Sequence, residues 1–271
     1  MPDQDNAAAD IERPVGANTA GRIARVAIVG AGLVGATTAY ALLLSGISAQ
    51  IVIINRDKAL ARAHVDDLRD AEVFSHTAQI TVGDFSDCCD CDIVVLTVGA
   101  SQSPLKASRL ENLQEAAGIL RSVVPQVAAS NPFAILLIAS NPVDVLTYAA
   151  WKWSGFPAAR IIGSGTSLDT SRLRRRLADH YGVAPDDVHA YVVGEHGDSQ
   201  VALLSSATIA GVPLAEFCRR RGEPPHLAEI AASARTRGEW KYSAPKAPLI
   251  TESRRLWFGL CGPFWTTSAP C

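Results

Sequence analysis

His196 is the side chain in this sequence best suited to exchange a proton. It lies in the segment 194–199 (GEHGDS), directly after the alternating run 188–193, which predicts a strand. Imidazole titrates near neutral pH, and the flanking glycines let backbone or a ligand come close. The same residues also suit an ordinary turn, so His196 by itself does not indicate catalysis.

A second polar cluster lies in the segment 165–172 (GTSLDTSR). Asp169 offers a carboxylate that could orient a histidine ring, and Arg172 offers a guanidinium that could bind an anion. Asp169 could also cap the helix predicted here, alone or together with the first role, and Arg172 belongs to the basic run 172–176, which is typical of a solvated face. The two clusters together favour a catalytic role for His196.

The segment 30–35 (GAGLVG) carries glycines at the spacing G-x-G-x-x-G. The apolar run 25–29 before it predicts a strand, and the alanine-rich residues after it predict a helix. In this context Gly30 makes the turn, Gly32 lets backbone approach a pyrophosphate, and Gly35 packs helix against strand. The helix N-terminus then faces the phosphates, so the motif predicts dinucleotide binding rather than a simple tight turn.

The next predicted strand, 50–54, should end in an acid that binds the adenosine ribose hydroxyls. Ile53 occupies the position where we expect that acid, and Asn55 and Arg56 follow. Asn55 could hydrogen-bond a ribose and Arg56 could meet a phosphate, but this strand end could also simply pack. The affinity for the cofactor and the choice between NAD and NADP therefore stay open.

Strands and helices alternate in the sequence that follows. We predict a helix over 57–70, strands over 79–82 and 93–98, a polar loop over 99–109, a helix over 110–130, a strand over 133–138, the turn 140–144 (SNPVD), a further helix and a strand over 160–162. This order predicts an α/β fold with a Rossmann-type, doubly wound parallel sheet. Its ligand should lie at the carboxyl ends of the strands, where Gly30, Gly99 and Asn141 fall.

The composition argues against several other classes of protein. The chain has 271 residues, of which 48% are hydrophobic, and a formal net charge of -2, so we expect neither global disorder nor a surface for nucleic acid. No apolar run reaches the length of a membrane span, and residues 1–22 resemble a flexible arm more than a signal peptide. Cys88, Cys89 and Cys91 lack a second cluster that would complete a metal site. We therefore expect no metal, and reduced thiols in a cytoplasmic protein.

The sequence resembles the L-lactate dehydrogenase branch of the lactate/malate dehydrogenase family from about Arg25 to Phe217. The resemblance rests on motifs that occur together in the family's order: 30–35, 99–109, 140–144, 163–172 and 194–199. It implies an NAD-binding Rossmann domain over 23–162 and an incomplete α+β substrate domain over 163–238. It also implies an NAD-dependent enzyme that interconverts lactate and pyruvate, assembled as a homotetramer.

The resemblance also implies a role for each residue of these motifs. His196 would exchange the substrate proton, Asp169 would fix the tautomer of its ring, and Arg172 would bind the substrate carboxylate through two parallel hydrogen bonds. Arg109 would polarise the ketone, and Asn141 would hold the substrate oxygen and the nicotinamide. The expected cofactor-binding residues are Gly30, Gly32, Leu33, Val34, Gly35, Gly99, Ala100 and Asn141. Taken singly, Arg109 could be a surface charge and Asn141 an ordinary turn residue.

Gln102 decides the substrate that the resemblance implies. The family holds glutamine there in lactate enzymes and arginine in malate enzymes, because the second carboxylate of a four-carbon acid needs a cation. The glutamine therefore favours pyruvate and lactate over the malate pair. The loop has one residue more than the family pattern before Arg109, and Leu105 and Lys106 replace a common Gly-Glu pair, which could hamper its closure.

Arg174 and His189 fall where bacterial lactate dehydrogenases bind fructose 1,6-bisphosphate across a subunit interface. Two cationic groups could meet a phosphate there, so the resemblance implies an allosteric site. The alternative is that Arg174 belongs only to a basic helix and that His189 is only a strand-end histidine.

The family pattern stops after about Gly238. The segment 239–271 holds three of the five tryptophans and four prolines, where the family has a long helix. Back-translated with synonymous codons and read from the third base, the sequence from Glu239 onward can encode Val-Glu-Ile-Leu-Arg-Ala-Lys-Gly-Ala-Thr, which matches that helix. We therefore expect a shift of reading frame near Gly238 and an aberrant tail. The alternative function is then a non-catalytic remnant that binds nucleotide or associates with intact subunits.

Overall fold

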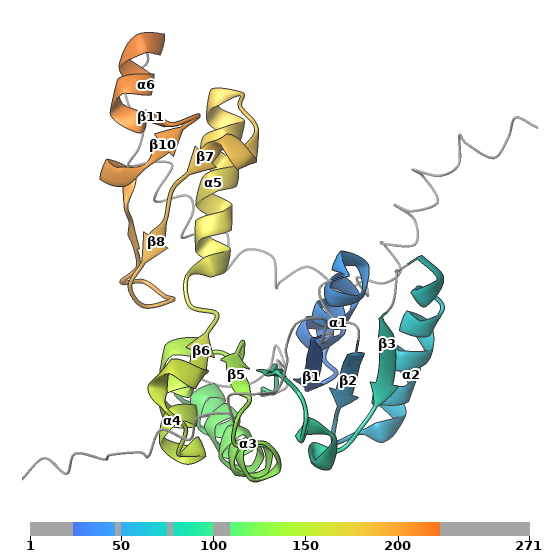
Figure 1. Ribbon diagram of the computed structural model, residues 1–271. Helices are drawn as coiled ribbons and strands as arrows, with labels where there is room; N and C mark the ends of the chain where they lie inside the picture. Colours follow the sequence, from blue (N-terminus) through green and yellow to red (C-terminus); the bar gives the residue numbers. More distant parts are fainter. Residues whose placement is uncertain (1–23, 47–49, 75–77, 100–108, 223–271) are drawn as a thin grey trace, which may run out of the picture.

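The computed structural model describes residues 24–46, 50–74, 78–99 and 109–222. The described residues form two units, which follow one another along the chain (Figure 1). The first is built on a parallel sheet, and the second on one long helix with short antiparallel strands. The arm expected over 1–22 and the tail expected over 239–271 lie outside the described residues.

The sheet of the first unit has six strands among the described residues. They are β1 (Arg25–Val29), β2 (Gln50–Ile54), β3 (Gln79–Val82), β4 (Ile93–Leu96), β5 (Ile135–Ile138) and β6 (Ile161–Gly163). Their order is β3-β2-β1-β4-β5-β6, and all neighbours are parallel. This is the strand order of a Rossmann fold, so the predicted fold class is confirmed. The order reverses between β1 and β4, where such folds bind their ligands.

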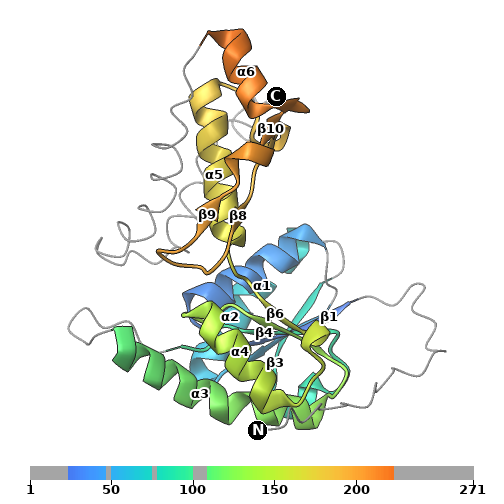
Figure 2. The same cartoon turned by 90° about the vertical axis from the view of Figure 1, so that its left-hand side faces the viewer.

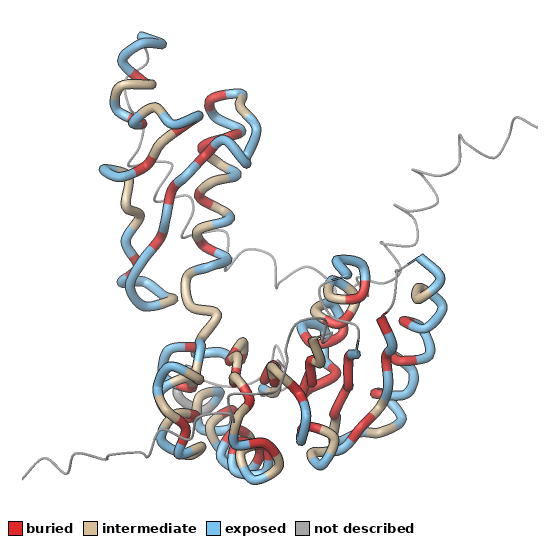
Figure 3. The backbone as a smooth tube through the Cα atoms, viewed as in Figure 1, coloured by how far each residue is buried: buried red, intermediate tan, exposed pale blue. Residues whose placement is uncertain are grey.

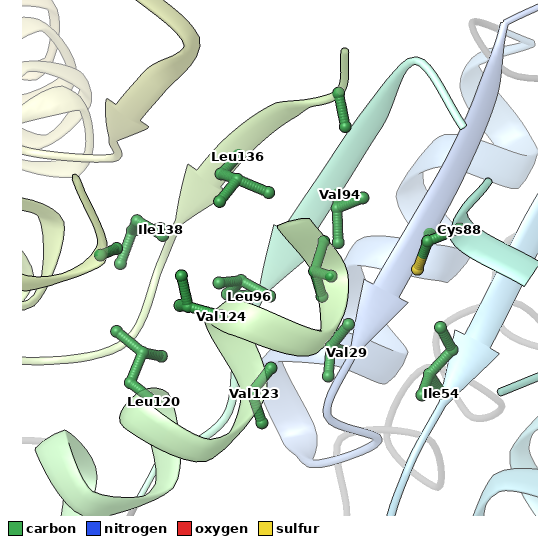
Figure 4. Close-up of a cluster of buried hydrophobic side chains, with 14 of the residues drawn as sticks. Val29, Ile54, Cys88, Val94, Leu96, Leu120, Val123, Val124, Leu136 and Ile138 are labelled. Carbon is green, nitrogen blue, oxygen red and sulfur yellow. The ribbon is translucent and has the colours of Figure 1, made fainter. Parts of the chain in front are cut away.

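Helices cover both faces of this sheet. One face carries α1 (Leu33–Ser45) and α2 (Lys58–Arg69), and the other carries α3 (Arg109–Ser130) and α4 (Val143–Ser154). Figure 4 shows Leu120 and Val124 of α3 packed among side chains of β4 and β5. Because helices cover both faces of the sheet, side chains on both sides of the central strands are buried, and these strands are apolar throughout.

Two local signals determine where helices of this unit begin and end. The side chain of Asp57 accepts hydrogen bonds from the backbone N–H groups of Ala59 and Leu60, so it caps the start of α2. Gly46 follows α1 with a φ of 66°, a left-handed conformation that glycine adopts without strain. The short 3-10 helices η1 (Glu72–Phe74), η2 (Phe85–Cys88) and η3 (Ala158–Arg160) complete the unit.

The second unit packs around α5 (Ser167–Tyr181) and α6 (Leu214–Arg221). Its core contains Leu173, Leu177 and Tyr181 of α5, and Figure 3 shows the buried positions along this helix. The remaining elements are η4 (Pro185–Asp187), β7 (Val188–His189), β8 (Val192–Val193), β9 (Val201–Ala202), η5 (Leu204–Ser206), β10 (Thr208–Ile209) and β11 (Val212–Pro213). They form a three-stranded sheet, β11-β10-β7, and a two-stranded sheet, β8-β9, within the described part of the chain.

The run 188–193 is not the single strand that its alternation predicts. It divides into β7, which pairs with β10, and β8, which pairs with β9. Between them, the carbonyl of Ala190 accepts a hydrogen bond from Arg174 Nε at 3.0 Å, and the carbonyl of Tyr191 accepts one from the Leu203 N–H at 2.8 Å. These hydrogen bonds give the two backbone carbonyls a partner where the chain passes from one sheet to the other.

The cysteines of the described residues are all free thiols. Cys88 and Cys91 are buried and Cys89 is exposed. Burial raises the pKa of the Cys88 thiol from 9.0 to about 12 and that of the Cys91 thiol to about 11. Within the described ranges, no group of three or more His, Cys, Asp or Glu residues is arranged to bind a metal. None of the helices in those ranges has the length and hydropathy needed to cross a membrane.

Candidate active site

The glycine-rich turn between β1 and α1 packs closely on one side and is open on the other. Gly30 has a φ of +109°, and a Cβ added to it would lie 2.8 Å from Thr97 Oγ1. A Cβ on Gly35 would lie 1.9 Å from the carbonyl oxygen of Gly30, so only glycine fits there. A Cβ on Gly32 would meet nothing within 4 Å. The turn therefore needs its first and third glycines for packing and leaves the second open to a ligand.

The N-terminus of α1 follows this open position directly. Its N-cap residue is Gly32, which provides no side-chain hydrogen bond, and the next residues, Leu33 and Val34, are 53% and 51% exposed. The N–H groups of a first helical turn have no partner within the helix, and the helix dipole places partial positive charge there. The turn and the helix start together fit the diphosphate of a dinucleotide such as NAD.

Ile53 lies within β2, one residue before its end at Ile54, and Asn55 follows the strand. Ile53 is 1% exposed and pairs with Ile28 and Val82 inside the sheet, so its side chain belongs to the core. Asn55 lies beside the glycine turn, where its Oδ1 accepts a hydrogen bond from the Ala31 N–H at 3.1 Å. Ile53 therefore presents no polar group to a nucleotide, and Asn55 is the first polar side chain after the strand.

Hydrogen bonds join the loops that follow β1, β4 and β5. Thr97 Oγ1 donates to the carbonyl of Gly30 at 2.8 Å, and Ser140 Oγ contacts the carbonyls of Leu96 and Val98. Asn141 comes next, exposed and joined to Pro142 by a cis peptide bond. Among the described residues, its side chain has no hydrogen-bond partner.

Three of the expected site residues lie beyond what the structure describes. Ala100 and Gln102 fall in the segment 100–108, outside the described residues. Arg109 is the first residue of α3, but its side chain is outside the described set. Gly99, just before this segment, is exposed at the end of the loop after β4.

His196 contacts Asp169 directly. The distance between His196 Nδ1 and Asp169 Oδ2 is 2.6 Å, and Asp169 is only 2% exposed. The other carboxylate oxygen, Oδ1, accepts a hydrogen bond from Arg172 Nη1 at 3.2 Å. The buried carboxylate of Asp169 therefore contacts two functional groups: the imidazole of His196, which can exchange a proton, and the guanidinium of Arg172, which can bind an anionic substrate.

The start of α5 brings Asp169 to this position. The N-cap residue of α5 is Thr166, so Asp169 lies inside the first turn and the alternative that it caps the helix is wrong. Thr166 Oγ1 donates to the carbonyl of Val192 at 2.6 Å, and the Val192 N–H donates to Thr170 Oγ1 at 3.0 Å. Because Val192 belongs to β8, these bonds set the strand before His196 against the helix that carries Asp169.

Arg174 and His189 lie on neighbouring elements of the second unit. Arg174 Nε donates to the carbonyl of Ala190, and its guanidinium lies 4.9 Å from the centre of the Tyr191 ring. His189 is exposed in β7 and faces Thr208 in the strand register. Arg174 thus has a structural role between β7 and β8 whether or not it also binds a phosphate.

Comparison with known proteins identifies the family. Residues 24–163 match the model of the NAD-binding domain of lactate/malate dehydrogenase, and residues 166–239 match the model of its alpha/beta C-terminal domain. The chain belongs to the lactate/malate dehydrogenase family. The motif-based resemblance is therefore confirmed.

Individual members of the lactate/malate dehydrogenase family are similar over most of this chain. It is 46% identical over 198 residues to an L-lactate dehydrogenase of Thermus aquaticus, covering 73% of this chain and 64% of that protein. It is 47% identical over 194 residues to a probable L-lactate dehydrogenase of Schizosaccharomyces pombe, covering 72% and 58%. The chain thus spans 64% or less of the length of these relatives.

Solved structures of family members have the same fold. The minor L-lactate dehydrogenase from Enterococcus mundtii, in its ligands-bound form, matches with a TM-score of 0.74 and 38% identity, over 79% of this chain and 68% of that one. A lactate dehydrogenase, MGS-M5, from a Medee basin deep-sea metagenome library matches with a TM-score of 0.74 and 38% identity, over 79% and 69%.

Sequence reasoning assigned no role to two of the contacts at this site. It considered Asn55 only as a ligand for ribose, whereas its side chain also supports the glycine turn at Ala31. Asp144 was part of a motif without a function of its own, yet its Oδ2 accepts a hydrogen bond from the backbone N–H of His196 at 2.8 Å. The only available signal for Asp144 was its position beside Asn141 at a helix start.

Proposed function

We propose that this chain is an NAD-dependent L-lactate dehydrogenase, which interconverts lactate and pyruvate. The observation that carries the proposal is the buried carboxylate of Asp169, which contacts both His196 and Arg172. Identity of 46% to an L-lactate dehydrogenase over 73% of this chain supports this reaction within the family.

NAD would supply the hydride chemistry, with its diphosphate at Gly32 and the N-terminus of α1. Asp169, 2.6 Å from Nδ1 of His196, accepts a hydrogen bond from the N–H of that nitrogen, so the proton stays on Nδ1 and the lone pair is on Nε2. Nε2 then takes the hydroxyl proton when lactate is oxidised and returns it when pyruvate is reduced. Arg172 binds the substrate carboxylate, where its planar fork can make two parallel hydrogen bonds.

The remaining roles rest on the family resemblance. Arg109 polarises the substrate carbonyl and stabilises the charge that develops on its oxygen. Asn141 holds the substrate oxygen and the nicotinamide, and its exposed position at the end of β5 supports this role. Gln102 leaves no cation for a second carboxylate, so pyruvate is preferred over oxaloacetate.

We propose that residues 23–162 form the NAD-binding domain and residues 163–238 a partial substrate domain. The segment 239–271 is then the product of a shifted reading frame near Gly238, since a back-translation with synonymous codons can encode the helix that the family has there. Reading the gene across this codon tests the idea, and a frame that continues without a shift relative to related genes contradicts it. The free thiols of Cys88, Cys89 and Cys91 suit a reducing, cytoplasmic location.

We also propose a homotetramer in which fructose 1,6-bisphosphate binds near Arg174 and His189. The support is the family resemblance and the presence of both side chains on adjoining elements of one unit. Sedimentation analysis measures the oligomeric state. Kinetics that do not change on addition of the sugar bisphosphate would remove the allosteric proposal.

The decisive experiment measures NADH oxidation by the purified 271-residue chain with pyruvate and with oxaloacetate. Each substrate is tested with and without fructose 1,6-bisphosphate, and a His196→Asn variant serves as the control for contaminating activity. We expect turnover of pyruvate in preference to oxaloacetate. A folded chain that binds NADH without turning over either substrate would instead be a non-catalytic, nucleotide-binding remnant.

A further inference from the structure

A single side chain joins the two units at the backbone of His196. The N–H of His196 donates to Asp144 Oδ2 at 2.8 Å, and the two residues are 52 positions apart in the chain. Asp144 belongs to α4 in the first unit, whereas His196 lies between β8 and β9 in the second. Figure 2 shows the β8–β9 loop on the side of the second unit that is turned toward the first.

The position of Asp144 is set by the packing of α4. Val143 and Leu146, its neighbours in the first turn of the helix, are 1% and 0% exposed and lie on the sheet side. Asp144 itself is exposed and projects away from that core. Asn141 lies three residues earlier, in the turn that leads into the same helix. The packing of α4 therefore fixes the position of Asp144 relative to Asn141.

His196 is therefore held at two separate points. Its ring contacts Asp169 of α5, and its backbone contacts Asp144 of α4. The first contact orients the imidazole, but the second sets the distance between the loop that carries it and the turn that carries Asn141. A hydrogen bond to a carboxylate is stronger than one between neutral groups, so this contact persists at an exposed position better than a neutral one would.

We propose that Asp144 is a positioning residue, which holds the His196 loop of one unit against the Asn141 turn of the other. The inference rests on the proposed function, in which Asn141 contacts the substrate oxygen and His196 exchanges its proton. A group that is displaced by about 1 Å from its reacting partner loses much of its effect on the rate. Loss of the Asp144 acceptor should thus impair proton transfer without changing either catalytic side chain.

Two substitutions separate this role from a simple effect of charge. Asp144→Asn removes the charge at the start of α4 but keeps an oxygen that can accept the His196 N–H. Asp144→Ala removes both the charge and the acceptor. Asp186→Ala is a matched control, because Asp186 is an exposed acid at the start of η4 whose side chain makes no hydrogen bond within the described residues.

The first readout is the hydrogen-exchange rate of the His196 amide, measured by NMR on the full chain. We expect exchange about ten-fold faster in Asp144→Ala, and rates close to the unsubstituted chain in Asp144→Asn and Asp186→Ala. The amides of Leu146 and Ala150 report whether α4 stays folded. An unchanged His196 rate in Asp144→Ala, with α4 intact, would overturn the proposal.

The second readout is pyruvate reduction. We expect kcat to fall about ten-fold in Asp144→Ala, with the KM for NADH unchanged, and to recover in Asp144→Asn. An active Asp144→Ala variant with unchanged kcat would also overturn the proposal. If the unsubstituted chain does not turn over pyruvate, the proposed function fails, and the His196 amide alone decides whether Asp144 holds the loop.

Discussion

Asp169 Oδ2 lies 2.6 Å from His196 Nδ1, although 27 residues separate the two in the chain. The carboxylate is almost completely buried, and its other oxygen contacts Arg172 at 3.2 Å. A change at Asp169 therefore acts on the proton-exchanging group and on the substrate-binding cation together.

Asp169→Asn should lower kcat for lactate oxidation by on the order of 100-fold or more. The amide of asparagine can present an N–H to His196 Nδ1, which would put the ring proton on Nε2, the wrong nitrogen for accepting a proton from lactate. Steady-state reduction of NAD with lactate as substrate measures the change. NADH binding, followed by fluorescence titration, should stay near that of the unsubstituted chain, and a kcat within two-fold of it would contradict the assigned role.

Arg172→Lys should lower kcat/KM for pyruvate by about 10- to 100-fold, because an ammonium cannot make two parallel hydrogen bonds to a carboxylate. Arg175→Lys is the matched control, since Arg175 lies on the same helix but is exposed and pairs with Asp179 at 2.8 Å. The control should behave like the unsubstituted chain. If the two substitutions changed kcat/KM for pyruvate equally, the guanidinium of Arg172 would have no specific role, and only the positive charge of α5 would matter.

Asn55→Asp should tighten NADH binding by about 3- to 10-fold, because a carboxylate at the end of β2 accepts hydrogen bonds from the ribose hydroxyls. Its oxygen can still accept the Ala31 N–H, so the glycine turn should be retained, although the hydrogen bond from Asn55 Nδ2 to the Asp57 carbonyl is lost. Binding of NADPH should weaken, since the added charge repels the 2′-phosphate. Titrations with both nucleotides test this, and a dissociation constant for NADH that is unchanged or higher would refute it.

The buried thiols of Cys88 and Cys91 should make the fold sensitive to alkali. Burial raises their pKa values from 9.0 to about 12 and about 11, so the unfolded chain ionises first as the pH rises. Their contribution to stability is fully present below pH 9.0 and is lost as the pH rises through about 11 to about 12.

Urea unfolding at about pH 8 and about pH 10.5 measures this dependence. The double variant Cys88→Ala, Cys91→Ala should lose less stability between the two pH values than the unsubstituted chain. Cys89→Ala, at the exposed thiol between them, should behave like the unsubstituted chain. If the free energy of unfolding changed equally with pH in the double variant and in Cys89→Ala, the prediction would be wrong.

Much of the first unit could be predicted from the sequence because its signals are local. The glycine spacing of 30–35 needs only a strand before it and a helix after it, and both are visible as apolar runs. The alternation of strands and helices determines a parallel sheet, since parallel neighbours need crossover connections. The order of the motifs along the chain indicates the same family that the two family models match.

The sequence is least informative where one local pattern is compatible with two different structures. Asn55 fits either a ribose contact or a packing role at the strand end, and only the structure shows its hydrogen bond with the Ala31 N–H. The alternation in 188–193 fits one strand as well as two, and only the partners β10 and β9 divide it.

The sequence by itself determined the fold class, the family and the residue types that can do the chemistry. Only the tertiary structure decided how His196 is held, between Asp169 on α5 and Asp144 on α4. Asp144 lies 52 residues from His196, and no spacing rule links residues so far apart in the chain. Their contact exists because two independently packed units meet at that point, and such a meeting depends on the packing of whole elements rather than on local sequence.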